Sequence, residues 1–400
     1  MEQTYVNKSL FPLNETTTLS EIVQLTQEWH EDLTFANHKE YSKLTGSKIV
    51  GHFPVYVPKE LIESFGIISV ALYGGGEVLE ISHSEAYLGS FICSVSKSTL
   101  ELGLIGNIKD FNCFVSPYIC DVARNLAGIF ERNFPDMPSH MMHYPQNFKS
   151  KGAVTYLMNE YKRLIAKFEK VSNKSFDPEK LREEIIVSNR IQKMLQKIDS
   201  ERVNNLGKLS ITEYYYLLRL RGLIPNVEYE KVLKLAQNEI SKRPTKKRDI
   251  IPVLVEGPFC EQPTVEVIQL IEDVGFHIVD SDFQVGQNFL SGPIPEEMDP
   301  LEALSTAYIN QSKPLPTRHN PIGREKEILE RIDKGKVKAV IFLTAKFCEP
   351  ALEDFVLYKE AMEKYRKDIQ YIHIEFEERS SNFEDVRLQL ETLLESILFD

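Results

Sequence analysis

Short apolar runs rich in β-forming residues alternate with amphipathic helical patterns in two separate parts of this 400-residue chain. The alternation begins near residue 50, is interrupted by a long helical stretch, and resumes after residue 246. Strands that alternate with helices are joined by crossover connections, which place the strands parallel in one sheet. The sequence therefore predicts an α/β protein with two parallel-sheet lobes.

The expected strands of both lobes end at turn or helix-start signals. They are the runs 48–57, 67–76 and 112–117 in the first lobe, and 250–258, 276–282, 337–344 and 368–376 in the second. The glycine run that closes the second of these is expected to be a turn, because it lacks the G-x-G-x-x-G pattern of a nucleotide site.

We expect four regions along the chain. They are an N-terminal helical segment (1–49), a first α/β lobe (50–150), a helical region with a linker (151–245) and a second α/β lobe (246–400). In the N-terminal segment, residues 18–33 carry one apolar face, with Ser20 as the expected cap.

Composition and charge exclude several classes of protein. Hydrophobic residues make up 42% of the chain and charged residues 26%, which is typical of a folded globular protein. The 47 basic and 59 acidic residues leave a net charge of −12, which argues against nucleic-acid binding. Five cysteines, no signal-peptide pattern and no apolar run of membrane-spanning length predict a soluble cytoplasmic protein without disulfides.

Three cysteines occupy positions suited to chemistry. Cys93, Cys120 and Cys348 lie where an extended run gives way to a helix, the edge at which open parallel sheets bind ligands. A helix N-terminus favours negative charge, so we expect lowered thiol pKa values there. Cys260 also follows a strand and is placed to line the same cleft, whereas Cys113 lies inside an apolar strand and is expected in the core.

The spacing of these cysteines leaves two interpretations open. No C-x-x-C motif is present, and a scattered cysteine is commonly a small buried apolar side chain. A three-cysteine metal site is the alternative hypothesis.

Seven blocks of sequence carry a resemblance to a known family. They are GHFPVYVPKELIESFG, SEAYLGSFICSVSKSTLELGL, SPYICDVARNLAGIFERNFPDMP, YPQNFKSKGAVTYLMNEYKRL, GPFCEQPTVEVIQLIEDVGFHIVDSDF, DPLEALSTAY and FCEPALEDFVLYKEAM. In this order they resemble the benzoyl-CoA reductase and 2-hydroxyacyl-CoA dehydratase superfamily. The second half is most similar to the smaller cluster-bearing subunit, the C type, of ATP-dependent benzoyl-CoA reductases.

The resemblance implies a fold, a cofactor and partners. It implies two Rossmann-like (flavodoxin-like) lobes with a 4Fe-4S iron–sulfur cluster between them, held by the cysteines that match the family's ligands, here Cys93, Cys120 and Cys348. It also implies a homologous larger cluster-bearing subunit, an acyl-CoA substrate, and a separate activator that hydrolyses ATP and carries its own cluster. The chain contains no G-x-x-x-x-G-K-[ST] motif, consistent with ATP hydrolysis elsewhere.

Glu60 matches a glutamate that the family places near the cleft. The resemblance implies that it positions substrate or a proton, and a solvated helix carboxylate is the alternative. The chain departs from the reductase pattern after Asp282, where a basic residue of the family is replaced by the neutral stretch 285–288.

Four functions remain open at this point. The leading one is an electron-transferring subunit of a dearomatising benzoyl-CoA reductase. The others are a 2-hydroxyacyl-CoA dehydratase subunit, an electron relay that does not bind substrate, and a double-cubane reductase. The last needs about six cysteine ligands, and this chain has five cysteines in all.

Overall fold

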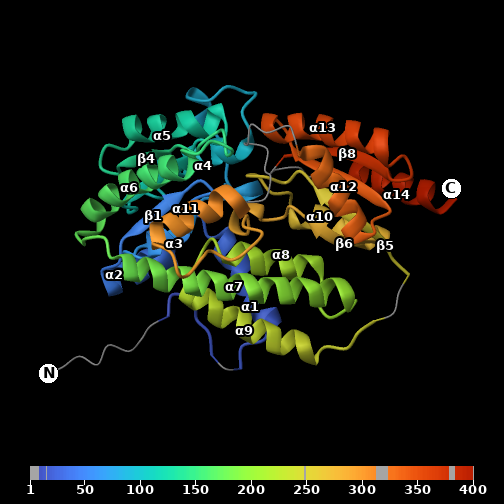
Figure 1. The fold of residues 1–400 in the computed structure, drawn as a ribbon, viewed down its shortest axis with the longest axis horizontal. Coiled ribbons are helices and arrows are strands. Elements are labelled where there is room, and N and C mark those ends of the chain that lie inside the picture. The colour runs from blue at the N-terminus through green and yellow to red at the C-terminus, as the bar shows by residue number, and fades with distance from the viewer. Residues whose placement is uncertain (1–8, 15, 247–248, 312–322, 378–382, 400) are drawn as a thin grey trace.

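Two four-stranded parallel sheets form the two ends of the molecule (Figure 1). The computed structural model describes residues 9–14, 16–246, 249–311, 323–377 and 383–399. The strands are β1 Ile49–His52, β2 Ile68–Ala71, β3 Cys113–Pro117, β4 Ser139–Met142, β5 Ile251–Glu256, β6 Phe276–Ser281, β7 Ala339–Ala345 and β8 Gln370–Phe376. This confirms the predicted α/β class with two parallel sheets.

The two sheets share one strand order. The first sheet runs β2-β1-β3-β4 and the second β6-β5-β7-β8, and each neighbouring pair is parallel. This is the order of flavodoxin-like doubly wound sheets. The winding direction reverses between β1 and β3 in the first sheet and between β5 and β7 in the second. Ligands bind beyond the carboxyl ends of the strands at such reversals.

The central strands are buried because helices cover both faces of each sheet. Every residue of β1, β3 and β7 is buried. The lobe helices are α3 Lys59–Glu63, α4 Ser94–Leu104, α5 Asp121–Asn133, α10 Val265–Val274, α11 Pro300–Gln311, α12 Arg324–Gly335, α13 Glu349–Tyr365 and α14 Phe383–Phe399. Short 3₁₀ helices occupy Gly76–Val78, Ser84–Ala86 and Val285–Gln287.

A layer of helices lies below both sheets in Figure 1 and joins them. It contains α7 Pro178–Asn204, α8 Ile211–Leu220 and α9 Asn226–Lys242, and α1 Leu19–Glu31 packs on α8 and α9. Helix α6 Ala153–Ser172 lies beside the first lobe and contacts β4 and α11. The remaining N-terminal helix is α2 Ala36–Thr45. Thr18, rather than the expected Ser20, caps α1, because its side chain accepts from the Glu21 N–H in a reciprocal capping box.

Two elements do not follow from the sequence pattern. Strand β4 contains no β-branched residue, so its propensity is weak. Helix α11 is buried around most of its circumference and therefore lacks one apolar face. It packs against α6 and α7, so a segment after β6 contacts helices that precede β5.

An aromatic cluster fills the space between the lobes. The ring of Tyr56, which follows β1, lies 5.2 Å from the Phe289 ring and 5.4 Å from the Tyr308 ring, centroid to centroid. Tyr144 stacks on Tyr308 at 4.6 Å. Phe259, just before Cys260, lies 6.2 Å from Tyr56. Aromatic side chains from both lobes therefore pack together beside Cys260.

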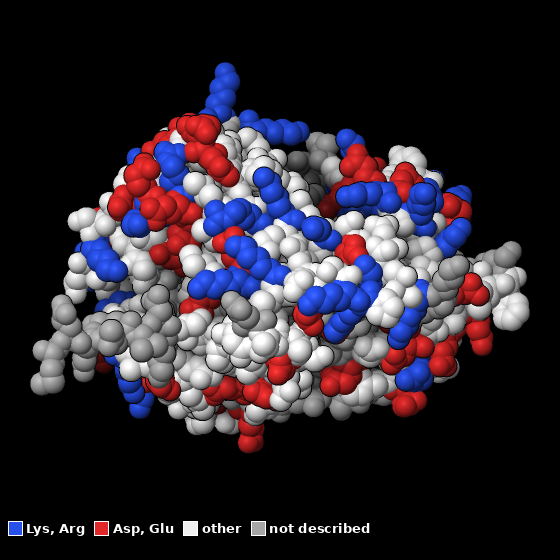
Figure 2. All heavy atoms as spheres, turned by 90° about the horizontal axis from the view of Figure 1, so that it is seen from below, with Lys and Arg blue, Asp and Glu red and all other residues white. Residues whose placement is uncertain are grey.

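Lysines and arginines gather over the middle of the face seen from below in Figure 2, although the net charge is −12. Arg190 on α7 and Lys234 on α9 both pair with Glu230, each with an N–O distance of 2.9 Å, and they hold the pKa of Glu230 at about 2.

Within the described ranges, every helix is too short or too polar to span a bilayer.

Candidate functional site

The sheet reversals bring cysteines to one edge of each lobe. In the second lobe Cys260 follows β5 and Cys348 follows β7, the two strands that flank the reversal. In the first lobe Cys120 follows β3, which also flanks a reversal, and Cys93 lies in the connection from β2 to α4. All four therefore lie beyond the carboxyl ends of strands, the binding edge of this fold.

Three of these cysteines occupy the N-cap positions of helices, as predicted. Cys93 precedes α4, Cys120 precedes α5 and Cys348 precedes α13. The Cys120 sulfur accepts a hydrogen bond from the Ala123 N–H at 3.4 Å. Backbone N–H groups at such positions stabilise an anionic sulfur or an anionic ligand bound to it.

The four thiols lie close enough to interact electrostatically. Cys348 interacts with Cys93 and Cys120, and Cys260 interacts with all three of the others. Cys93, Cys120 and Cys348 are partly exposed and Cys260 is buried. Cys113 is fully buried in β3 and its thiol faces the Phe114 carbonyl at 3.7 Å, which confirms it as a core residue.

The expected lowering of the thiol pKa values is wrong for the metal-free protein. Burial raises the pKa of Cys93 to about 12, and it also raises the pKa values of Cys120, Cys348 and Cys260. The mutual repulsion of the thiolates adds to this effect. Desolvation outweighs the helix N-termini because a buried thiolate loses its water. A metal bound here must displace thiol protons.

The cysteines supply thiol donors from separate elements of both lobes. Among the described residues, no group of three or more His, Cys, Asp or Glu side chains is arranged to hold one ion. In an iron–sulfur cluster each cysteine binds a different iron, so the sulfurs stand apart. Cys93, Cys120 and Cys348 come from both lobes and precede three different helices, so they would bind such a cluster from separate elements.

A carboxylate links the two lobes at this point. Glu261 follows Cys260 and is only 2% exposed. It accepts hydrogen bonds from the Ser94 hydroxyl at 2.5 Å and from the Val95 N–H at 3.1 Å, both in the first turn of α4. The second lobe therefore contacts the helix that carries Cys93.

Glu60 lies in a separate polar pocket and is buried, so the solvated alternative is wrong. It accepts a hydrogen bond from the Ser188 hydroxyl at 2.5 Å, and the Arg221 guanidinium lies 3.8 Å away. The cavity of about 30 Å³ beside them is also lined by Asn189 and Gln192 of α7. This volume is enough for about one or two waters. None of the four clustered cysteines lines it.

Arg221 supplies a positive charge beside the neutral stretch 285–288. It donates to the Gln287 carbonyl at 2.6 Å and to the Ser188 hydroxyl at 2.9 Å. Gly286 lets this stretch lie close to the loop after β1, since an added Cβ would stand 2.1 Å from the Pro54 carbonyl oxygen. A guanidinium from the end of α8 therefore contacts the neutral stretch 285–288.

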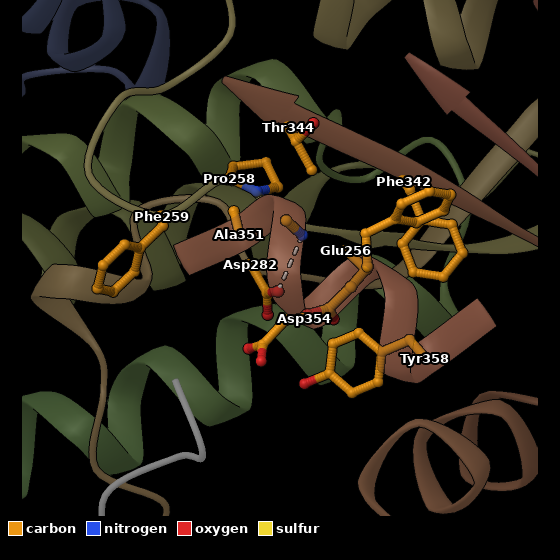
Figure 3. A pocket seen from close by; sticks show the side chains of 11 residues that line it. Glu256, Pro258, Phe259, Asp282, Phe342, Thr344, Ala351, Asp354 and Tyr358 are labelled. Atoms are coloured by element: carbon orange, nitrogen blue, oxygen red, sulfur yellow. Dashed lines mark hydrogen bonds between the residues drawn. The ribbon is translucent and has the colours of Figure 1, made fainter. Parts of the chain in front are cut away.

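A second cavity, of about 10 Å³, lies at the carboxyl ends of β5 and β7 and is lined by Glu256 and Thr344 among others (Figure 3). Figure 3 shows Asp282, Asp354 and Tyr358 turned toward the same space. The Gly257 N–H donates to Asp282 at 3.2 Å. Burial raises the pKa of Asp354 to about 6.

Arg331 neutralises part of this acidic wall. Its guanidinium pairs with Glu256, with Asp280 at 2.8 Å and with Asp282 at 3.0 Å. Burial, followed by repulsion from Asp282, nevertheless raises the pKa of Glu256. These ion pairs connect α12 to the ends of β5 and β6, and β5 leads to Cys260.

The sequence analysis missed Glu261, Arg221 and Arg331. A signal existed only for Glu261, which is adjacent to a cysteine at a strand end. Arg221 and Arg331 lie at or within helices, and charged helix positions are usually solvated. Their burial depends on contacts made by distant segments.

The fold and the site define an α/β protein with two doubly wound lobes whose binding edges share a cluster of thiols. The family described as "2-hydroxyglutaryl-CoA dehydratase, D-component" matches residues 54–397. The chain belongs to this family, which confirms the resemblance inferred from its sequence blocks.

Three relatives show the range of the family. The chain is 30% identical over 381 residues to the C subunit of benzoyl-CoA reductase from Thauera aromatica, covering 94% of this chain and 98% of that protein. It is 23% identical over 359 residues to the (R)-phenyllactyl-CoA dehydratase beta subunit of Clostridium sporogenes, covering 90% and 94%. It is 21% identical over 360 residues to the (R)-2-hydroxyglutaryl-CoA dehydratase beta subunit of Acidaminococcus fermentans, covering 89% and 94%. All three are named as enzyme subunits, so the chain is similar to components of multi-subunit enzymes that act on CoA thioesters.

Proposed function

We propose that this chain is the iron–sulfur subunit of an ATP-dependent acyl-CoA reductase of the benzoyl-CoA reductase type. The observation that carries the proposal is the meeting of Cys93, Cys120 and Cys348 from two lobes at helix N-termini. The choice of reductase over dehydratase is supported by 30% identity to a reductase subunit, against 23% and 21% to two dehydratase subunits.

Cys93, Cys120 and Cys348 would hold a 4Fe-4S cluster between the lobes. Such a cluster supplies low-potential, one-electron transfer to a CoA thioester. The protein contributes thiolates from both lobes and backbone N–H groups that stabilise their negative charge. The raised thiol pKa values mean that assembly of the site releases protons.

Glu60 would hold a proton or orient a polar group of the substrate. Its hydrogen bond from Ser188 and the nearby Arg221 guanidinium fix the orientation of the carboxylate. The small cavity beside it has space for a water that exchanges protons with the carboxylate. This role is a proposal from the family resemblance and from the burial of Glu60.

The proposal includes partners and a compartment. A homologous larger cluster-bearing subunit would complete a heterodimer, and a separate activator with its own cluster would couple ATP hydrolysis to electron delivery. The cytoplasm is the proposed location, since all five cysteines are unpaired and a reducing compartment keeps them so.

An electron relay without a substrate site is a second candidate, and Cys260 is the observation that favours it. Cys260 interacts with all three proposed ligands and would add a fourth thiol to the site. A cluster with four cysteine ligands has no open iron for substrate. The dehydratase function stays as a further alternative, because two of the relatives named above are dehydratase subunits.

The test begins with anaerobic purification of the wild type, Cys348→Ser and the matched control Cys113→Ser. About four irons and four sulfides per chain, with a reduced-state EPR signal that changes in Cys348→Ser but not in Cys113→Ser, supports a three-cysteine cluster. About eight irons supports the double-cubane form. Absence of iron after reconstitution refutes the proposal.

Substrate then separates the remaining functions. The chain is co-purified with its larger subunit and activator and assayed with ATP and benzoyl-CoA, then with a 2-hydroxyacyl-CoA. Ring reduction supports the reductase, and loss of water from the hydroxyacyl thioester supports the dehydratase. Substrate turnover by this chain without the larger subunit would refute the relay.

A further inference from the structure

Glu261 makes a direct bond between the lobes beside the cysteine cluster. Its two carboxylate oxygens accept from the Ser94 hydroxyl at 2.5 Å and the Val95 N–H at 3.1 Å. The donor and acceptor residues are separated by 167 and 166 positions in the chain. The bond from Val95 is buried and the bond from Ser94 is part-buried, while Glu261 itself is 2% exposed.

The bond replaces a missing local cap. The N-cap residue of α4 is Cys93, whose side chain makes no capping hydrogen bond. By contrast, the Cys120 side chain caps α5 through the Ala123 N–H. A helix start leaves N–H groups that need acceptors, and a carboxylate is a strong one. Glu261 therefore satisfies the start of the helix that positions Cys93.

The same carboxylate places a negative charge next to the thiols. Glu261 directly follows Cys260 in the chain, and its carboxylate oxygens accept from Ser94 and Val95, the two residues that follow Cys93. A fixed negative charge opposes any further negative charge placed near it. Burial limits the screening of this interaction by water and salt.

We propose that Glu261 is a positioning residue that holds the Cys93 helix against the second lobe and lowers the reduction potential of the cluster bound there. The proposal rests on the proposed function, because it presupposes a cluster at these cysteines. Reduction adds one electron to the cluster, so a fixed negative charge nearby disfavours the reduced form. The direction suits a site that delivers strongly reducing electrons.

The test compares the anaerobic holoprotein of the wild type with Glu261→Gln, which keeps the shape and removes the charge. Iron content is measured first, and the reduction potential is then measured by EPR-monitored titration. Glu261→Gln is expected to shift the potential to more positive values, and Glu261→Asp, which keeps the charge, to stay near the wild type. The matched control is Glu228→Gln, a buried carboxylate that accepts from the Leu10 and Phe11 N–H groups at 2.8 Å each, within the helical layer.

A second readout tests positioning in the metal-free protein. Alkylation of Cys93, followed by peptide mass spectrometry, is expected to be faster in Glu261→Gln than in the wild type or in Glu228→Gln. Equal potentials in the wild type and an iron-replete Glu261→Gln refute the electrostatic role. If Glu261→Gln loses iron, the potential is measured in iron-loaded Glu261→Asn, which also removes the charge; a positive shift there supports the proposal, and a wild-type potential refutes it.

Failure of the proposed function gives a different result. In that case the wild type itself holds no iron after reconstitution, whatever residue stands at position 261. The alkylation rates then still decide the positioning role. Equal rates in all variants refute it, and a faster rate confined to Glu261→Gln supports it.

Discussion

Replacing Arg331 with Gln should selectively destabilise the second lobe. Arg331 pairs with Glu256, Asp280 and Asp282, and its side chain is 17% exposed. A neutral glutamine side chain in its place would leave three carboxylates facing one another at the end of β5. Two of them, Glu256 and Asp282, are buried.

The magnitude follows from burial. Removing one partner of a buried ion pair costs about 3–5 kcal/mol, because the remaining charge stays out of water. Protonation of the abandoned carboxylates limits this cost, which places the expected loss near the lower end, about 3 kcal/mol. For a lobe of this size, about 3 kcal/mol corresponds to a fall in Tm of roughly 6–12 °C.

The assay is scanning calorimetry of the metal-free protein at pH 7, with Arg366→Gln as the matched control. Arg366 also pairs with two carboxylates, Asp333 and Asp368, but these are 73% and 64% exposed. Exposed pairs contribute about 0–1 kcal/mol, so the control should shift Tm by only a few degrees. Equal shifts in the two variants would refute the reasoning.

Three further substitutions probe other parts of the site. Cys260→Ser should keep about four irons per chain but change the EPR spectrum if Cys260 is a ligand of a relay cluster, and an unchanged spectrum excludes that role. Gly286→Ala should destabilise the protein by about 1–3 kcal/mol in urea unfolding, because the added Cβ would clash with the Pro54 backbone of the other lobe. Gly128→Ala in α5 is the control and should be neutral or stabilising, because its Cβ meets nothing within 4 Å. Burial raises the pKa of Glu327 to about 7 and that of Asp354 to about 6, so the stability contributed by their protonated forms is full below pH ~4 and is lost as the pH rises toward 7. Unfolding curves of Glu327→Gln should show a weaker fall in stability between about pH 5 and pH 7, and an unchanged slope would contradict this assignment.

Local signals in the sequence account for much of the fold. The strands around β1, β3, β5 and β7 are apolar runs bounded by turn residues, so their existence and parallel arrangement could be predicted. Strand β4 and helix α11 could not, since one lacks β-forming residues and the other lacks a single apolar face. Both form because neighbouring segments bury them.

Some properties of the candidate site could likewise be predicted from local sequence, and others depend on tertiary contacts. The N-cap positions of Cys93, Cys120 and Cys348 follow from where helices begin, which is a local property of the chain. The upward shift of their pKa values could not be predicted from the sequence, because desolvation and the charge of Glu261 depend on how the two lobes pack together. The burial of Glu60 beside Ser188 likewise depends on a contact across 128 positions.

The sequence by itself therefore determined the α/β class, the two parallel sheets, the family and the helix-start positions of three cysteines. These depend on periodicity, capping and strand-end signals that span a few residues each. Only the tertiary structure decided that Glu261 bridges the lobes and that Arg221 stands beside 285–288. Burial and electrostatic interactions are set by distances in space, and segments far apart in the chain meet only when the two lobes pack together.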